Sequence, residues 1–259
     1  MPPAVCIPIL VEETIGRDRP DELLRFSVPV PRGVLKGGAN VTLRDSHERA
    51  LPTDSTPLMF WSDGSIKWLS VDAAVPLRGR ERARFHLCPA DPIQGEPQSV
   101  PGVRVEKESG YTIDTGVARF RVGLNGAVIE AAAVRGVDLL DEAGVRLSLT
   151  GCAGLPYRPV TTELLLEDES PLRVVAVLEG HFVPIRATPG TPVRLEFRIR
   201  LIFVAGHSVV RLEVQLHNPS AARHPGGLWD LDDRGTAVFE DVSLSLKPAG
   251  QVDDIRWSA

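Results

Sequence analysis

Apolar side chains fall at every second position over several stretches of this chain. In the clearest stretch, residues 193–203, the apolar set is Val193, Leu195, Phe197, Ile199, Leu201 and Phe203, and the polar set is Arg194, Glu196, Arg198 and Arg200. Successive side chains of a β-strand point to opposite faces of the sheet. The alternation therefore predicts a strand with one buried side and one solvated side.

A second alternating stretch follows directly and predicts a hairpin. Here Val210, Leu212, Val214 and Leu216 face in, and Arg211, Glu213, Gln215 and His217 face out. The link of residues 205–208 is short enough to join the two strands directly. Residues 118–122 and 242–246 alternate in the same way, and the best helical candidate, residues 21–25, covers a single turn. Antiparallel sheets with one wet face produce such patterns, so the fold class predicted is all-β.

Turn residues divide the chain into two predicted domains. The 23 glycines and 22 prolines recur at intervals suited to short strands and turns. Between about residues 88 and 101 the chain is rich in Pro, Gly and polar residues and shows no periodicity. We therefore expect one β domain over residues 1–92 and another over residues 101–250. Antiparallel barrels and sandwiches are the architectures that accommodate so many strand edges.

Composition and charge exclude several classes of partner. Hydrophobic residues make up 43% and charged residues 24%, which is typical of a globular protein. The 29 basic residues are scattered singly and the net charge is −5, so nucleic acid is not an expected partner. No stretch approaches the roughly 20 apolar residues of a membrane span. No basic residue precedes Arg17, as a secretory signal would require, so we expect a cytoplasmic protein.

Cysteine and histidine give no recognisable chemical motif. Cys6, Cys88 and Cys152 are odd in number and far apart, without the spacing of a zinc site or of a disulfide framework. We expect all three to be small buried hydrophobic residues. His47, His86 and His181 lie in or beside expected strands and are predicted to be surface residues. Signatures of serine hydrolases, P-loop proteins, dinucleotide-binding folds and zinc proteases are absent, and neither a cofactor nor a metal is expected.

The segment PLMFWSDGSIKWLSVD predicts a tight hairpin. Asp63-Gly64 between apolar runs favours a two-residue type I′ turn, which would pair Trp61 with Ile66 and Met59 with Trp68 on one face. Trp61 and Trp68 then belong either to the core or to a platform on which a sugar ring stacks. The preceding PVPRGVLKGG predicts a strand that ends in a tight turn at the rim of its sheet.

A long segment between the last two expected strands gathers polar side chains. Loops of this length without regular structure are often functional. The segment spans residues 217–235 and contains His217, Asn218, His224, Trp229, Asp230, Asp232, Asp233 and Arg234. These residues can bind a sugar or position an acid and a base, or Trp229 can plug the end of a sandwich while Asp232 and its neighbours form a turn. The run DLDD lacks the spacing of a calcium loop.

Taken in order, five segments resemble the rhamnogalacturonan exolyase family of polysaccharide lyases and its bacterial relatives. They are PVPRGVLKGG, FWSDGSIKWLSVD, TGVARFRVGLNGAVI, SPLRVVAVLEGHF and HPGGLWDLDDRGTAVFEDVSL. The resemblance spans roughly residues 20 to 247. It implies a small N-terminal RIFT-type barrel followed by a central antiparallel β-sandwich. In the family an α/α toroid comes next, and this chain stops shortly after the last expected sandwich strand.

The resemblance implies the β portion of a carbohydrate-active enzyme that is not catalytically complete alone. The implied reaction is β-elimination in a uronate-containing polysaccharide, which needs a base for the C5 proton and a cation for the carboxylate. Our catalytic candidates are His217 or His224 as the base and Arg234 as the cation. Candidates for binding a polysaccharide or oligosaccharide are Trp61, Trp68, Asn218, Trp229, Asp230 and Asp232. The alternative is a non-catalytic module that binds carbohydrate or packs against another domain, such as the toroid, and a β protein without a sugar ligand is a third hypothesis.

Overall fold

The fold is built almost entirely from antiparallel strands, as the alternation predicts. The computed structural model describes residues 6–38, 40–90, 102–186, 194–220 and 235–250. Within these ranges the single helical element is a short 3₁₀ turn, η1 (Cys152–Gly154). The prediction of an all-β protein is therefore confirmed. The chain divides into two compact units, and each is described by itself.

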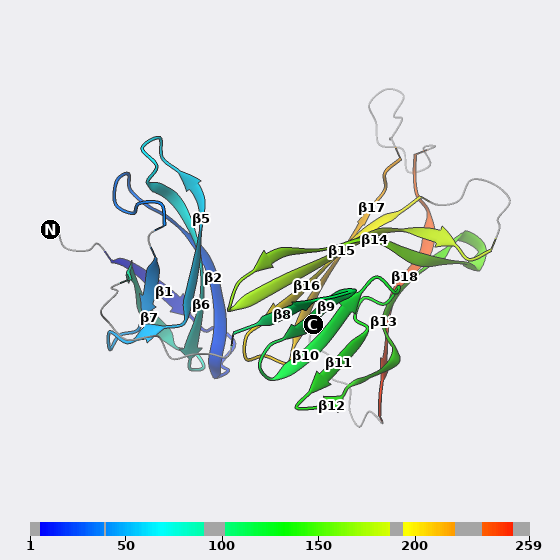
Figure 1. The fold of residues 1–259 in the computed structure, drawn as a ribbon, viewed down its shortest axis with the longest axis horizontal. Coiled ribbons are helices and arrows are strands. Elements are labelled where there is room, and N and C mark those ends of the chain that lie inside the picture. Colours follow the sequence, from blue (N-terminus) through cyan, green and yellow to red (C-terminus); the bar gives the residue numbers. More distant parts are fainter. Residues whose placement is uncertain (1–5, 39, 91–101, 187–193, 221–234, 251–259) are drawn as a thin grey trace. The chain divides into compact units, whose positions relative to one another are not determined.

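The first unit comprises residues 1–103 together with two short segments, 170–173 and 204–206. It contains a four-stranded and a three-stranded antiparallel sheet (Figure 1). The first has the order β1 (Ile7–Glu12), β7 (Arg82–Pro89), β3 (Val41–Arg44) and β4 (Ala50–Leu51). The second has the order β2 (Arg19–Pro29), β6 (Ile66–Leu77) and β5 (Thr53–Phe60). Alternate residues of β6, from Leu69 to Leu77, are buried and form the centre of the apolar core.

The helical candidate at residues 21–25 is wrong. These residues lie inside β2 and pair with β6, where Leu23 faces Ala74 and Phe26 faces Val71. A single turn has no intrinsic stability as a helix. The packing of Leu24 and Phe26 against the core cluster decides in favour of the strand.

The prediction for the three cysteines is wrong in two respects. Cys6 and Cys88 form a disulfide with a Cα–Cα distance of 4.3 Å across a sequence separation of 82 residues. Cys6 is exposed, and Cys152 is a free, exposed thiol. Only Cys88 is buried as expected. Spacing along the sequence could not reveal the bond, because the pairing of β1 with β7 is what brings the two residues together.

The second unit contains a five-stranded and a six-stranded antiparallel sheet. The five-stranded sheet has the order β12 (Val137–Asp138), β11 (Ala131–Val134), β10 (Ala118–Gly123), β9 (Gly110–Asp114) and β8 (Arg104–Lys107). The six-stranded sheet has the order β17 (Val210–His217), β16 (Glu196–Val204), β15 (Arg173–Pro184), β14 (Leu155–Glu169), β13 (Leu140–Gly151) and β18 (Phe239–Pro248). Phe120 of the first sheet lies against Phe203 of the second, with ring centroids 5.2 Å apart, so the two sheets share an apolar core.

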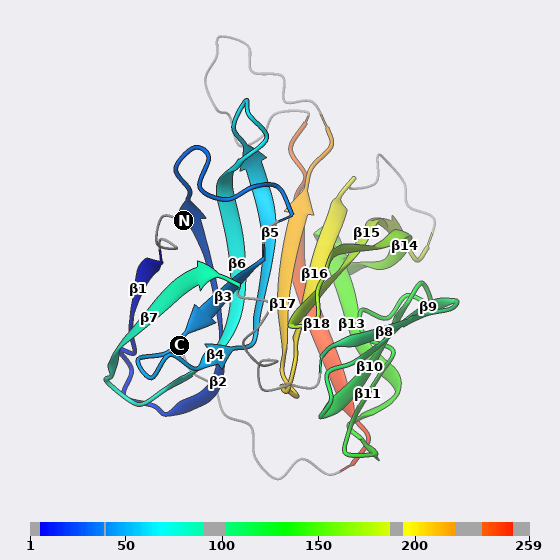
Figure 2. The ribbon, with the colours of Figure 1, turned by 60° about the vertical axis from the view of Figure 1, so that its left-hand side comes forward.

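The predicted faces of β16 agree with the structure, whereas Val214 and Leu216 of β17, which are predicted to face in, are exposed. Phe197, Ile199 and Phe203 are buried, whereas Arg198 lies on the opposite face. The hairpin is also present, since β16 and β17 lie side by side (Figure 2). Phe197 pairs with Leu216 and Phe203 pairs with Val210. Its second strand is nevertheless poorly covered, since β17 lies at the edge of the sheet and Leu216 is 38% exposed.

Candidate functional site

A broad cleft lies over the strands β14 to β17 of the second unit. Its volume is about 1100 Å³, large enough for several sugar rings. The polar side chains that line it come from four neighbouring strands and the chain next to them: Thr162, Glu179, His181, Arg194, Glu196, Arg198, Gln215 and His217. Most belong to the solvated face that the alternation predicts. No tryptophan or tyrosine is found among its lining residues in the described part of the chain.

Strand pairing arranges these side chains in rows across the sheet. The amide of Phe182 donates to the carbonyl of Leu195 at 3.0 Å, which aligns β15 with β16 as an antiparallel pair. In this register His181 lies beside Glu196. Glu196 in turn pairs with His217 on β17. Glu196 therefore lies between two histidines in one cross-strand row.

The next row contains a network of ion pairs. Arg198 Nε lies 3.2 Å from Glu179 Oε1, and Arg198 Nη2 lies 3.3 Å from Glu167 Oε1. Arg200 binds Glu167 with two hydrogen bonds of 2.7 Å, and the hydrogen bond to this carboxylate raises the pKa of Arg200. These opposite charges compensate one another, and the two parallel hydrogen bonds between Arg200 and Glu167 also orient this pair.

Two arginines at or beside one end of the cleft have no ion-pair partner among the described residues. Arg194 lines the cleft, and Arg158 faces Val183, another lining residue, on the same side of the sheet. Both side chains are exposed. Neither makes an ion pair or a side-chain hydrogen bond with any residue of the described ranges. In a chain of net charge −5 this leaves a local excess of positive charge.

Two of the residues predicted in the 217–235 segment belong to this region. His217 is exposed, and its Nδ1 lies 3.0 Å from Glu196 Oε2. Asn218 follows it and is half-buried, donating from Nδ2 to the carbonyl of Gly235 at 2.6 Å and accepting from the amide of Ser220 at 3.0 Å. The Asn218 side chain thus joins the two ends of the 217–235 segment. The other predicted residues, His224, Trp229, Asp230, Asp232, Asp233 and Arg234, lie outside the described residues.

The predicted type I′ hairpin in the first unit is wrong in its turn type. The amide of Trp61 donates to the carbonyl of Ser65 at 2.7 Å, and the amide of Gly64 donates to the carbonyl of Trp61 at 3.0 Å. The loop therefore has three residues. Gly64 has φ +80°, whereas Asp63 does not have a positive φ. A three-residue loop with one left-handed glycine is the next commonest hairpin connection.

Register irregularities in this hairpin separate side chains that the prediction puts on one face. Met59 pairs with Trp68 as expected, but Ile66 pairs with Phe60 rather than with Trp61. The register shifts on both sides of Met59. As a result Ile66 is fully buried in the core while Trp68 is 39% exposed.

The hairpin tip is tied to the turn that follows β2. The indole Nε1 of Trp61 donates to the carbonyl of Val30 at 3.0 Å, and Lys67 Nζ lies 4.7 Å from the centre of the same ring system. Arg32 Nε donates to Asp63 Oδ2 at 3.0 Å, and Ser65, whose hydroxyl bonds to Asp63, is the main cause that lowers the pKa of Asp63 to about 2. Trp61 is therefore engaged in bracing the tip, while Trp68 keeps an accessible surface.

The described residues show neither a metal-binding cluster nor a membrane-spanning helix. These residues contain no group of three or more His, Cys, Asp or Glu side chains arranged to hold a metal ion. No helix among them is long and apolar enough to cross a membrane.

Comparison with known proteins identifies the first unit. Residues 15–87 match the family model of the PcRGLX-like N-terminal RIFT barrel domain. The first unit therefore contains a PcRGLX-like RIFT barrel. The expected resemblance to the rhamnogalacturonan exolyase family is confirmed for this domain, and the matched residues include the braced hairpin and the turn after β2.

One curated relative extends beyond the RIFT barrel. The chain is 27% identical over 210 residues to the uncharacterized protein YetA of Bacillus subtilis (strain 168). The match covers 76% of this chain but 23% of YetA, so the chain spans about a quarter of that protein's length. A match of this length includes residues of both units.

The sequence predicts only part of the cleft. His217 is a predicted catalytic residue, and Arg194, Glu196 and Arg198 are predicted to lie on a solvated face. Glu179 and Gln215 have no predicted functional role. The site forms where four strands lie side by side, and its side chains meet only because of how these strands pair. A single sequence does not reveal that pairing.

Proposed function

We propose that this chain is the β portion of a carbohydrate-active protein and binds a uronate-containing oligosaccharide in the cleft over β14 to β17. The observation that carries the proposal is the exposed guanidinium of Arg194 in the cleft, with the exposed Arg158 beside the lining residue Val183; among the described residues neither has an ion-pair partner. The RIFT barrel of the first unit supports the link to carbohydrate, since it matches a domain of a family named for a rhamnogalacturonan lyase.

The chemistry of the cleft suits such a ligand. A guanidinium group binds a carboxylate through two parallel hydrogen bonds, which gives both strength and orientation. Glu179, Gln215 and Thr162 offer planar or hydroxyl groups for sugar hydroxyls. The cleft is open and its lining mixes polar with apolar side chains, so hydrogen bonds and charge can act beside apolar contacts with the sugar rings.

We propose that the chain alone binds without cleaving. β-Elimination requires a base close to the C5 proton and a cation at the carboxylate. In the cleft, His217 held by Glu196, His181 and the cation Arg194 are of the types these roles require, but the family resemblance implies that the β portion is not catalytically complete alone. The eliminative step is measured directly by the absorbance of an unsaturated uronate. We expect none from the chain by itself, and release of this product that His217→Ala abolishes would show that the chain is catalytic.

Titration calorimetry with a rhamnogalacturonan oligosaccharide tests the binding. Arg194→Gln is expected to weaken binding about tenfold, the effect of losing one charge-assisted hydrogen-bonded contact. Arg146→Gln is the matched control, because Arg146 is exposed on β13 of the same sheet and does not line the cleft. Equal loss in both variants, or equal binding of a neutral oligosaccharide of the same length, would contradict the proposal.

A role in packing against another protein domain is the second candidate. It is favoured by apolar side chains that the edge strand β17 leaves uncovered, Val214 at 39% and Leu216 at 38% exposed. Val214 does not line the cleft, so it separates the two roles. Binding of a hydrophobic dye that Val214→Ser removes, together with no saccharide binding in the calorimeter, would favour this role. Saccharide binding that survives Val214→Ser would favour the first.

A further inference from the structure

Strand β1 is held on the RIFT barrel by a single ladder and by its two ends. It lies at the edge of its sheet, where Ile7 pairs with Leu87 and Glu12 pairs with Arg82 of β7. Its inward side chains, among them Ile9 and Val11, are only partly buried against the core. An edge strand has hydrogen bonds on one side only, so the fixation of its ends decides whether it stays in place.

The end of β1 that leads into the barrel is firmly fixed. The carboxylate of Glu13 accepts hydrogen bonds from the amides of Gly16 at 2.6 Å and Arg80 at 3.0 Å, and its side chain is 2% exposed. These bonds join the chain after β1 to the turn before β7. They act as a hinge about which the rest of the strand can move.

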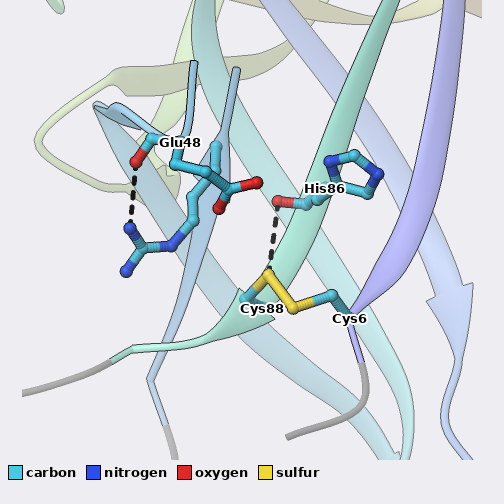
Figure 3. Close-up of a disulfide and its surroundings, with 5 residues drawn as sticks. Cys6, Glu48, His86 and Cys88 are labelled. Carbon is cyan, nitrogen blue, oxygen red and sulfur yellow. Dashed lines mark hydrogen bonds between the residues drawn. A yellow bond between two sulfur atoms is a disulfide. The ribbon is translucent and has the colours of Figure 1, made fainter. Parts of the chain in front are cut away.

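The other end of β1 is fixed by the Cys6–Cys88 disulfide. Cys6 directly precedes Ile7 and Cys88 directly follows Leu87, so the bond lies just beyond the last pair of the ladder (Figure 3). Cys6 is exposed, whereas Cys88 is 6% exposed. A thiolate from solution can therefore reach the sulfur of Cys6.

The exchange depends on access to Cys6 rather than on charges around Cys88. The Arg44 guanidinium is engaged elsewhere, since its Nη1 donates to the carbonyl of Glu48 at 3.0 Å. Cys88 is the buried sulfur of the pair, so it is the leaving group when a thiolate attacks Cys6.

Strand β1 and both cysteines lie outside the residues that match the RIFT barrel family. The match covers residues 15–87, so it starts after β1 and ends directly before Cys88. The buried core comes mainly from β2, β3, β6 and β7. The barrel is thus expected to keep its fold when β1 leaves it.

We propose that Cys6–Cys88 is a site of reversible thiol–disulfide exchange that locks β1 onto the RIFT barrel. When the bond is oxidised, β1 is fixed at both ends. When the bond is reduced, β1 stays attached at Glu13 and separates from β7 at its Cys6 end. Disulfides persist in oxidising compartments and are reduced in the cytosol. Strand β1 is therefore locked onto the barrel in oxidising compartments and released at its Cys6 end in the cytosol.

The exchange balances with a dithiol as the reductant. One thiolate of the dithiol attacks Cys6 Sγ, forms a mixed disulfide and releases Cys88 as a thiolate, which takes up a proton. The second thiol of the reagent then attacks the mixed disulfide and releases Cys6, which is protonated in turn. Two electrons pass to the protein sulfurs, and the dithiol becomes a cyclic disulfide.

Release of β1 uncovers two features of the barrel. The edge of β7 loses its only partner on that side and becomes able to pair with another strand. Ile7 also lines a small apolar cavity of about 30 Å³, together with Leu69 and Leu87. Removal of Ile7 opens this cavity to solvent.

Amide hydrogen exchange followed by mass spectrometry tests the proposal on the full chain. The Cys152→Ser variant is used, so that the exposed free thiol does not take part. After treatment with a dithiol, the amides of residues 7–12 are expected to exchange about 100-fold faster, a change typical of local opening, while those of β6 stay protected. Reoxidation is expected to restore the original protection.

The Cys6→Ser variant provides the matched control. It should show the fast exchange of residues 7–12 without any reductant, and a dithiol should leave it unchanged. Unaltered exchange of β1 after full reduction would overturn the proposal. So would simultaneous loss of protection in β1 and β6, because the disulfide would then support the whole barrel rather than lock one strand.

Discussion

The carboxylate of Glu13 joins two parts of the RIFT barrel that are far apart in the sequence. It accepts hydrogen bonds from the amides of Ile15, Gly16, Arg17 and Arg80 and from the guanidinium of Arg19. The bond from the Arg80 amide is the largest of the causes that lower the pKa of Glu13 from 4.5 to about 2. A glutamate between a strand and a loop gives no sign of this role in the sequence.

The first prediction concerns the pH dependence of stability. A carboxyl group whose folded pKa is depressed stabilises the fold fully above its ordinary value, and this contribution is lost as the pH falls toward the folded value. Glu13→Gln should therefore lower the urea midpoint of the first unit at pH 7. The difference in urea midpoint between Glu13→Gln and the natural protein should shrink as the pH falls from 4.5 to about 2. A difference that stays constant over this range would show that the charge of Glu13 is not what stabilises the loop.

The second prediction concerns Gly180, which lies in β15 next to the cleft. A methyl group there would collide with the carbonyl oxygen of Val160 and with the ring of Phe197. Gly180→Ala should destabilise the second unit by about 1–3 kcal/mol, the usual cost of overpacking. Gly250→Ala is the control, since nothing lies within 4 Å of its added atom. Urea unfolding measures both, and equal midpoints for the two variants would contradict the close approach of β14 and β15.

At the scale of single elements, the faces of strands could be predicted, while their registers could not. The alternation assigns Phe197 and Arg198 to opposite faces, because a shift of one residue would move the whole apolar set of the strand from the core to solvent. The hairpin at Asp63-Gly64 differs, because one left-handed residue and two register shifts take the place of the regular type I′ turn. Such shifts depend on contacts with the turn after β2, which local sequence does not contain.

The third prediction separates the roles of the two tryptophans of the hairpin. Trp61→Phe removes the hydrogen bond to the carbonyl of Val30, and the first unit should lose about 1 kcal/mol of stability, the usual net contribution of such a bond. Trp68→Phe should change the stability little, because Trp68 is 39% exposed. Thermal unfolding measures both. Equal destabilisation would mean that Trp61 does not brace the tip.

The hairpin also offers a place to test the predicted sugar platform. If Trp68 stacks on a sugar ring, its fluorescence should change on addition of the oligosaccharide in the Trp61→Phe variant. Trp68→Ala is expected to weaken binding of the oligosaccharide roughly fivefold to tenfold, which corresponds to the loss of one exposed aromatic contact. An unchanged affinity would leave the cleft of the second unit as the binding site.

At the scale of the whole molecule, the all-β class and the RIFT barrel could be predicted, and the cleft and the disulfide could not. Both depend on residues that strand pairing brings together from distant parts of the chain. Glu179 and Arg198 meet across two strands, and Cys6 and Cys88 are 82 residues apart. The expected cytoplasmic location stays a prediction, and the state of the Cys6–Cys88 bond in protein isolated without added oxidant will bear on it.

The most direct test of saccharide binding in the cleft is an NMR shift map of the isotopically labelled chain during titration with a rhamnogalacturonan oligosaccharide. The account predicts that the largest shifts occur at Arg194, Glu196 and Gln215 and at the side chain of Arg158, and that they diminish with added salt because the contacts are ionic. A map in which these residues do not move, while other surfaces do, would contradict it.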